Sequence, residues 1–266
     1  LLEYEMRKQY AELGQGLVHA SGVTVDGSTL IFPAWRHTGK TNLMLNLLQE
    51  YSGEYLSDDR LWVHSDGKVS GYNLPVNMMP YNVKTFAGLS SFSTKERLAA
   101  KASNTARWVA HSGDGLIPKA ASFLNIFYLE PAAGKRIMID ELLPETSFKR
   151  RTDADAVVLL QTAPEDDIVS LEETTASEVY KSIVAASHYE WNEELEEFCR
   201  VFDSLFEGED RFSEYRDLVD SENDIFESFL DHVPVFTLTI PREEQWVEKG
   251  IGEQAVGHIE TILSEI

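Results

Sequence analysis

The sequence is poor in cysteine, in basic residues and in long apolar runs. Its single cysteine, Cys199, excludes an intramolecular disulfide and fits a reducing cytoplasm, where we expect the protein to lie. The chain contains no run of about 18 apolar residues, so we expect neither a membrane span nor a membrane partner. Leu195, Phe202 and Leu205 share a helical face with Cys199, which predicts that its thiol is buried.

The balance of charge excludes one class of partner. Lys and Arg number 23 against 45 Asp and Glu, which gives a formal net charge of −22. Such a surface repels phosphodiester backbones, so we expect no nucleic-acid partner. The acids either solvate the whole surface, as in a high-salt cytoplasm, or cluster in one helical region. Residues 165–231 hold the densest acidic stretch and favour the second arrangement in part.

The remaining composition is that of a folded domain. The chain has 266 residues, 43% of them hydrophobic and 11% aromatic, and can bury a sizeable core. No internal repeat, low-complexity segment or linker divides it. We therefore predict one α/β domain over 1–266, a mixed twisted sheet with flanking helices. Its core would comprise 17–165 and 232–266, and residues 170–231 would form an acidic helical segment in the C-terminal part.

A hairpin followed by a loop and a helix is predicted near the N-terminus. Asp26-Gly27 separates two alternating apolar runs, at about 17–25 and 28–33, and favours a two-residue hairpin turn. Leucines at helical spacing then predict a helix at 40–51. Strand, loop and helix follow one another here, which is the context of a phosphate-binding loop.

The rest of the chain shows shorter patterns. Ser93 and Glu96 have the spacing of a capping box and predict the start of a helix over 93–111. Compact apolar runs bounded by turn residues predict buried strands. The further predicted elements are a helix within 1–16, strands on both sides of 58–59, buried strands at 122–131, 154–163 and 233–241, helices over 170–230 and a helix at 252–263.

The loop in "FPAWRHTGKTNLML", residues 32–45, has the working end of a phosphate-binding loop. Backbone N–H groups and the Lys40 ammonium would face phosphates, and the Thr41 hydroxyl would ligate Mg²⁺. Ala34 stands where the motif G-x-x-x-x-G-K-[ST] has its first glycine, and alanine resists positive φ. The predicted nucleotide-binding residues are Ala34, Trp35, Arg36, His37, Thr38, Gly39, Lys40, Thr41 and Asn42.

Three side chains of this loop allow alternative roles. Trp35 either stacks on a base or packs against a neighbouring element, and we favour packing. Arg36 and His37 either add positive charge near the phosphates or face solvent. Neither alternative changes the prediction that the loop holds phosphate.

An acidic pair follows the loop at a functional distance. Asp58-Asp59 come after a short predicted strand, 18 residues beyond Lys40. A P-loop kinase needs a carboxylate at the end of a neighbouring strand, to hold Mg²⁺ or to accept the acceptor's proton. The alternative for this pair is a solvated turn, which the upstream loop disfavours.

The segment "VHASGVTVDGSTLIFPAWRHTGKTNLMLNLLQEYSGEYLSDDRLWVHSDGKV" resembles the catalytic domain of HPr serine kinase/phosphorylases and their wider relatives, which include phosphoenolpyruvate carboxykinases. In both, a histidine (here His19) leads a strand, a hairpin and phosphate loop follow, and Arg60 comes after the Asp-Asp pair. The resemblance is specific over about 17–77, while later strands are similar only in kind and order. It implies an α/β P-loop domain of that superfamily that binds ATP, or another nucleoside triphosphate, and Mg²⁺.

The resemblance also implies roles for individual residues. Lys40 would contact the β- and γ-phosphates, and Thr41 would ligate Mg²⁺. Asp58 would act as general base toward the acceptor hydroxyl and Asp59 would hold the metal, although the two aspartates could exchange these roles. His19 would lie beside the pair and orient or tune it.

Three features depart from the family or lie outside its motif. Residues 33–38 replace the small Gly/Ser-rich loop usual in the family, and its second glycine-rich signature is missing, so neither HPr as substrate nor the phosphorylase reaction is implied. Arg150 and Arg151 follow Lys149 just before a predicted strand. They either clamp the transferred phosphoryl group or an anionic acceptor, or pair with nearby surface acids.

Two functions from different classes remain open. One is an ATP- and Mg²⁺-dependent kinase that transfers the γ-phosphoryl group to a hydroxyl of a protein, peptide or small molecule. The other is a nucleotide-binding regulatory or assembly protein that kept the pocket and lost turnover, which the altered loop favours. A carboxykinase is a weaker alternative because no oxaloacetate-binding signature is present.

Aromatic side chains recur at helical intervals in the acidic region. We predict that most of them lie in the core. The alternative is an oligomer or partner surface, so a homo-oligomer remains an open alternative. The residues are Tyr189, Trp191, Phe198, Phe202, Phe206, Phe212 and Phe226.

Overall fold

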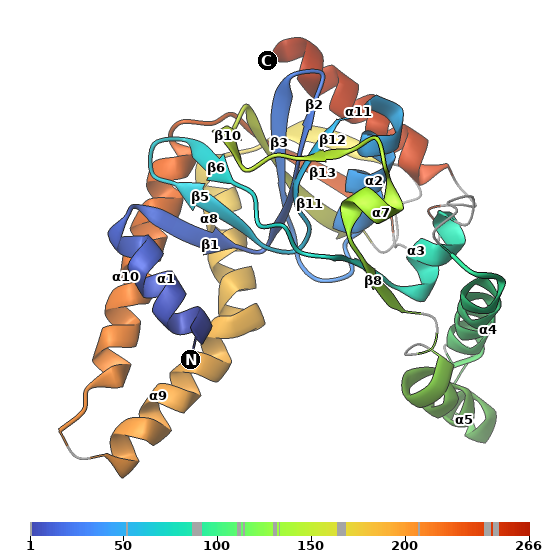
Figure 1. The fold of residues 1–266 in the computed structure, drawn as a ribbon, viewed down its shortest axis with the longest axis horizontal. Coiled ribbons are helices and arrows are strands. Elements are labelled where there is room, and N and C mark those ends of the chain that lie inside the picture. The colour runs from blue at the N-terminus through green and yellow to red at the C-terminus, as the bar shows by residue number, and fades with distance from the viewer. Residues whose placement is uncertain are drawn as a thin grey trace.

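The computed structural model describes most of the chain. The described residues are 2–51, 53–86, 92–110, 113, 115–129, 132, 134–163, 169–206, 208–241, 246 and 250–266. Residues 111 and 130–131, the ends of two predicted elements, lie outside them. A body of sheets and helices carries two helical projections that extend on the same side (Figure 1).

A seven-stranded mixed sheet forms the centre of the body, in the order β12-β13-β11-β3-β2-β4-β9. β13, β11 and β3 are parallel, whereas β2 is antiparallel to both β3 and β4. β3 and β4 therefore run in the same direction, and their C-terminal ends lie at the same edge of the sheet. The strands are β2 Ala20–Val25, β3 Ser28–Pro33, β4 Glu54–Ser57, β9 Ser147–Phe148, β11 Ala156–Ala163, β12 Ser170–Glu173 and β13 Val235–Pro241.

The β2–β3 hairpin turns where the sequence predicts it. Asp26 and Gly27 have φ of 49° and 87°, and Val25 pairs with Ser28 across them. Both positive values suit a tight primed turn, which follows the twist of the flanking strands. The run predicted as one strand over 17–25 is interrupted at His19, where the chain leaves a second sheet and enters the central one.

Helices cover both faces of the central sheet. Phe32 and Val158 pack in one core with α2 and α11, whereas Ile31 and Val157 pack in another with α1, α8 and α10. Side chains alternate across a strand, so a sheet covered on both faces is apolar on both. The helices are α1 Leu2–Glu12, α2 Lys40–Tyr51, α8 Ala176–Ser187, α10 Arg211–Leu230 and α11 Ile251–Glu265. The predicted helices at 40–51 and 252–263 are thereby confirmed.

Two smaller sheets and two short helices complete the body. A four-stranded sheet has the order β1-β5-β6-β10, and β7 pairs with β8 in a two-stranded sheet. These elements are β1 Gln15–Val18, β5 Leu61–His64, β6 Lys68–Ser70, β7 Val76–Met78, α3 Pro80–Thr85, β8 Lys135–Ile137, α7 Ile139–Leu142 and β10 Arg151–Asp153.

The two projections differ in position along the chain. We call residues 193–230 the acidic arm, which contains α9 (Glu193–Leu205) and α10. We call residues 94–129 the basic arm; it contains α4 (Thr94–Ala110), α5 (Leu116–Leu124) and the π-helix η1 (Asn125–Leu129). Figure 1 shows the arms on opposite sides of a gap beneath the body. The predicted capping box at the start of α4 is confirmed, because Ser93 and Glu96 exchange hydrogen bonds.

The structure corrects two secondary-structure predictions. Residues 122–129 continue α5 and form η1 instead of a buried strand. A short apolar run has no period that separates a strand from a helix, and this run packs beside α4. Residues 170–173, predicted to be helical, form β12 because they pair with β13 at the edge of the sheet.

The burial of the aromatic residues differs from the prediction. Trp191 and Phe226 are buried, but Tyr189, Phe198 and Phe206 are exposed. Helical spacing does not show which face of a helix is covered, and Phe198 lies on a part of α9 that extends beyond the body. Cys199 is buried as predicted. Among the described residues, no helix combines the length and apolar character that crossing a membrane requires.

Candidate functional site

The topology brings three separate segments to one edge of the central sheet. β2 lies between β3 and β4 and runs opposite to both, so its first residues lie beside the last residues of its neighbours. His19 and Ser21 are therefore placed between the loop 34–39 and Asp58-Asp59. The sequence-predicted loop, histidine and acidic pair meet here.

A cavity of about 430 Å³ opens at this edge. This volume lies within the range of small-molecule sites. The loop, the acidic pair and the β7–α3 and β8 segments line it. The lining residues are Arg36, His37, Thr38, Gly39, Lys40, Thr41, Asp58, Asp59, Arg60, Asn77, Met79, Tyr81 and Arg136.

The loop backbone shows why glycine is not needed at its first position. Ala34 is buried and continues β3 by bridging to Leu160 of β11. Positive φ occurs instead at His37 (60°) and Gly39 (99°). A Cβ on Gly39 would lie 2.5 Å from Cζ2 of Trp246, so side-chain contact as well as φ requires glycine there.

Lys40, the first residue of α2, is held by its own loop and by His19. Its ammonium donates to the carbonyl oxygens of Ala34 (3.1 Å) and Trp35 (3.3 Å), and lies 2.7 Å from His19 Nε2. Because an ammonium only donates, Nε2 accepts and the imidazole is neutral. Burial and the Lys40 charge lower the pKa of His19 to about 3, in agreement.

Asp58 is a buried carboxylate at the end of β4. Ser21 Oγ donates to its Oδ1 at 2.9 Å, and Thr41 Oγ1 lies 3.1 Å from its Oδ2. Burial, and next the Asp59 charge, raise the pKa of Asp58 to about 6, while Ser21 and Lys40 act in the opposite direction. A carboxyl of this pKa can exchange a proton near neutral pH.

Asp59 is exposed and connects the pair to His19. Its backbone has φ of 79°, an uncommon value for a residue other than glycine. Its Oδ1 lies 3.4 Å from His19 Nδ1, the ring nitrogen that carries the proton if Nε2 accepts from Lys40. His19 thus lies between Lys40 and Asp59.

The acidic helical region supplies a residue that the sequence reasoning missed. Glu190 belongs to the π-helix η2 (His188–Asn192), and its side chain is only 4% exposed. Its Oε2 accepts a hydrogen bond from Arg36 Nε at 2.6 Å, and its Oε1 lies 3.9 Å from His19 Nε2. No local sequence signal marks Glu190, although π-helices are frequent at functional sites.

Trp35 packs as favoured from the sequence. Its ring meets that of Tyr189 edge to face, with centroids 5.7 Å apart. Thr38 Oγ1 donates to the Trp35 carbonyl at 2.6 Å, which closes the turn of the loop. The loop is therefore fixed to η2 through Trp35 and Arg36.

Other sequence-predicted residues lie outside the cavity. Asn42 is buried, and its amide oxygen accepts from Asn82 Nδ2 at 2.7 Å, which joins α2 to α3. Arg151 lies on β10 and contacts His64 Nδ1 at 3.3 Å, and exposed Arg150 precedes it. Neither arginine lines the cavity, so the structure does not bring Arg150 and Arg151 to the loop 34–39.

The donor set fits Mg²⁺ bound together with phosphates. Among the described residues, no group of three or more His, Cys, Asp or Glu side chains could hold a metal alone. Mg²⁺ commonly uses one or two carboxylates with substrate phosphates and water. Thr41 and the two aspartates offer a hydroxyl and carboxylates in the cavity, and a cation would offset the burial of Asp58.

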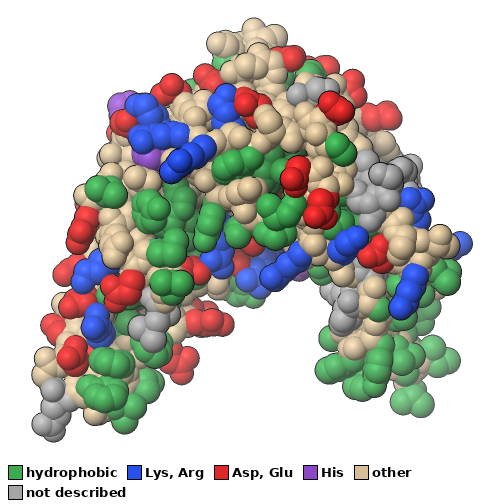
Figure 2. All heavy atoms as spheres, viewed as in Figure 1, with side chains coloured by type: hydrophobic (Ala, Val, Ile, Leu, Met, Phe, Trp, Pro, Cys, Tyr) green, Lys and Arg blue, Asp and Glu red, His purple; other side chains and the backbone are tan. Residues whose placement is uncertain are grey.

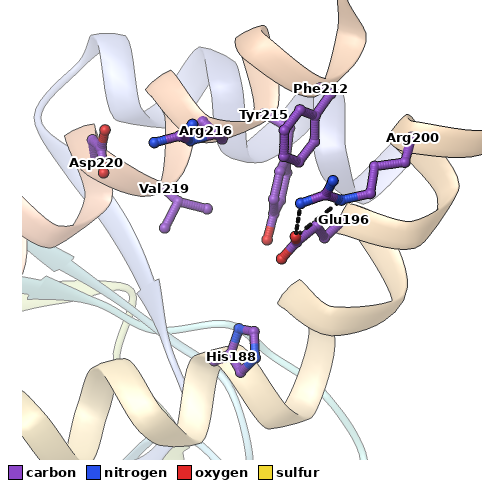
Figure 3. A pocket seen from close by; sticks show the side chains of 8 residues that line it. All are labelled: His188, Glu196, Arg200, Phe212, Tyr215, Arg216, Val219 and Asp220. Carbon is purple, nitrogen blue, oxygen red and sulfur yellow. Dashed lines mark hydrogen bonds and ion pairs between the residues drawn. The ribbon is translucent and has the colours of Figure 1, made fainter. Parts of the chain in front are cut away.

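A second cavity, of about 370 Å³, lies between η2, α9 and α10 (Figure 3). Arg200 pairs with Glu196 there and stacks over Phe212 at 4.0 Å. The Tyr215 hydroxyl donates to the Asn192 carbonyl. The contacts of Arg200 with Phe212 and of Tyr215 with Asn192 join α10 to α9 and η2. The groove lacks the loop and the paired carboxylates of the first cavity.

Comparison with known proteins finds only a weak structural similarity. No family model and no curated protein matches the chain. Among solved structures, it is similar to the HPr(Ser) kinase/phosphatase from Coxiella burnetii, with 10% identity and a TM-score of 0.26, over 59% of this chain and 72% of that chain. This is at most a distant structural relationship and assigns no activity.

Proposed function

We propose that the protein is an HPr-kinase-like phosphotransferase that moves the γ-phosphoryl group of ATP, or another nucleoside triphosphate, to a hydroxyl of a protein, peptide or small molecule. One observation carries the proposal. Asp58, a buried carboxyl with a pKa raised to about 6, lines the same cavity as Lys40 and the glycine-containing loop at the start of α2. A base and a phosphate cradle in one cavity are the parts that this chemistry needs.

In the proposed reaction the acceptor oxygen attacks the γ-phosphorus while the bond to the β,γ-bridging oxygen breaks. The nucleoside diphosphate leaves with that electron pair, and Asp58 accepts the hydroxyl proton. Lys40 and the N-terminus of α2 offset the negative charge of the phosphates. Mg²⁺ held by Thr41 and an aspartate would supply further charge neutralisation.

A nucleotide-binding protein without turnover is the second candidate, and the contacts of two cations, Lys40 and Arg36, favour it. Lys40 is bonded to His19 and to two loop carbonyls, and Arg36 is bonded to Glu190. Both cations would have to exchange partners to reach phosphates. A loop held this way is suited to sensing nucleotide by rearrangement.

Nucleotide binding and phosphoryl transfer, measured separately, test both candidates. Calorimetry with a non-hydrolysable ATP analogue and Mg²⁺ gives affinity, and ATP labelled on the γ-phosphate, with cell extract as acceptor, gives transfer. We expect Lys40→Ala to weaken binding by about 100-fold and Asp58→Asn to bind but lose transfer by about 100-fold or more. Arg150→Ala is the matched control, a cation outside the cavity, and should change neither.

The outcomes separate the candidates. Binding without transfer or hydrolysis by the wild-type protein would exclude the phosphotransferase and leave the nucleotide-binding protein. Absence of nucleotide binding would exclude both. Equal loss of binding in Arg150→Ala and Lys40→Ala would show that binding does not occur in this cavity.

A further inference from the structure

The basic arm carries an apolar face that no other described part of the chain covers. α5 has no buried side chain among its residues. Leu116 is 85% exposed, Ile117 75% and Phe127 62%. Trp108 of α4 is exposed as well. Figure 2 shows apolar side chains gathered at the free end of this arm. Monomeric proteins seldom expose so many neighbouring large apolar side chains.

The acidic arm carries a second such face on α9. Phe198, Val201 and Leu205 follow one another at intervals of three and four residues, so they lie on one side of the helix. All three are exposed, Leu205 by 70%. Phe206 is exposed at the end of the same helix. An apolar stripe of this spacing is typical of a helix that packs against another helix.

The two arms have opposite charge. Residues 193–230 contain 14 acidic and three basic residues, a formal charge of −11, half of that of the whole chain. Residues 94–129 contain five basic and two acidic residues, a formal charge of +3. Unlike charges attract at an interface and like charges repel, so each arm favours contact with the other kind and not with its own.

We propose that the basic arm of one copy of this chain docks on the acidic arm of a second copy, so that α5–η1 covers the exposed stripe of α9. A two-fold arrangement makes this contact twice, because each copy contributes one arm of each kind, and it closes the assembly as a dimer. This inference is independent of the proposed reaction.

The position of the arms favours a second copy over a membrane surface. Both arms extend on the same side of the body (Figure 1). A membrane that received the apolar end of the basic arm would bring its anionic surface toward the acidic arm, which would be repelled. The basic arm of a second copy would instead be attracted by the same acidic residues.

Complementation between broken arms tests the proposal. Variant one, Ile117→Asp/Phe127→Asp, breaks the basic arm, and variant two, Val201→Lys/Leu205→Lys, breaks the acidic arm. Each variant alone lacks one member of every contact. We expect the wild-type chain to sediment as a dimer, each variant to dissociate at least about tenfold more readily, and an equal mixture to recover heterodimer through its one intact contact.

Controls and opposing outcomes complete the test. Ile266→Asp removes an exposed apolar residue outside both arms and should leave the dimer unchanged, and circular dichroism verifies that every variant folds. Added salt should weaken the dimer because charge attraction is screened. A monomeric wild-type chain at about 100 µM, or failure of the mixture to recover dimer, would overturn the proposal. So would binding of a monomeric wild-type chain to phosphatidylglycerol vesicles, lost in variant one, which would assign the arm to membranes.

Discussion

The sheet edge and the two arms differ in which side chains they bury and which they expose. At the sheet edge, the buried charged groups contact other parts of the chain, as Lys40 contacts His19 and Asp58 contacts Ser21. In the arms, large apolar groups are exposed. Buried polar groups persist only with partners, and large exposed apolar patches indicate a partner outside the chain. The site is therefore built within one chain, whereas the proposed partner of the arms is a second chain.

The boundary between the two regions runs through η2. Glu190 reaches from this helix into the site, while α9 continues from it into the acidic arm. Arg7 of α1 fixes the same junction, since its guanidinium bonds Glu222 of α10 and Asn192 of η2. The acidic arm and the loop 34–39 are thus both attached to η2.

The largest effect is expected from Arg7→Met at this junction. Arg7 is fully buried, and its Nε donates to Glu222 Oε1 at 3.0 Å. The substitution leaves a buried carboxylate without its cation, so the free energy of unfolding should fall by about 3–5 kcal/mol in urea titration. Arg7→Met/Glu222→Leu should recover most of the loss. Lys8→Met, which breaks an exposed pair with Glu214, should cost about 1 kcal/mol or less.

A small effect of Arg7→Met would alter the comparison directly. It would mean that α10 is attached to the body by its apolar contacts alone. The acidic arm would still differ from the basic arm, because α10 buries Leu218, Phe226 and further apolar residues, whereas α4 buries only Ala100 and Ser103.

The sequence predicted the part of the site that is continuous in the chain. Local sequence signals predict the hairpin, the loop and α2. These signals are the Asp26-Gly27 pair, whose residues adopt positive φ, a glycine before Lys40, and leucines at helical spacing. These signals act within a few residues, so they can be recognised without knowledge of the rest of the fold.

Residues that come from distant segments could not be predicted. Glu190 and Arg7 owe their burial to pairing across more than 150 residues, which no spacing records. The prediction of a buried strand at 122–129 was wrong in burial as well as in type, because the large apolar side chains of Phe123–Tyr128 are exposed. Apolar composition indicates that a surface will be covered, and the covering chain can be another molecule.

The next largest effect concerns pH at the sheet edge. Burial raises the pKa of Asp58 to about 6, above the ordinary value of about 3.9, so the folded state binds more protons between these values. Stability contributed by Asp58 should therefore fall as pH rises from about 4 to about 6, by at most about 3 kcal/mol, and then level off. Unfolding of the wild type and Asp58→Asn, compared in EDTA at several pH values, isolates this contribution.

The pH dependence of the stability difference between wild type and Asp58→Asn reports on the site alone. The arm acids are common to both proteins and cancel in the comparison, so the remaining slope belongs to the site. A wild-type minus Asp58→Asn difference that does not change with pH would mean that Asp58 is not desolvated. Its proposed role as a base near neutral pH would then lose its support.

The smallest effect compares the two helix starts that lead into the arms. Thr175 with Glu178 caps α8, and Ser93 with Glu96 caps α4, each through reciprocal hydrogen bonds. α8 buries Val179 and Ile183 against the body, so Thr175→Ala should lower the global free energy of unfolding by about 1 kcal/mol.

Ser93→Ala should act differently because α4 packs little against the body. It should raise amide hydrogen exchange in the first turns of α4 by about fivefold and leave the urea midpoint unchanged, since an arm that opens locally need not unfold the sheet. Ser204→Ala, an exposed position inside α9, is the control and should change neither. Equal shifts of the urea midpoint in Ser93→Ala and Thr175→Ala would show that the basic arm unfolds together with the body. Its apolar face would then belong to the same cooperative unit as the site.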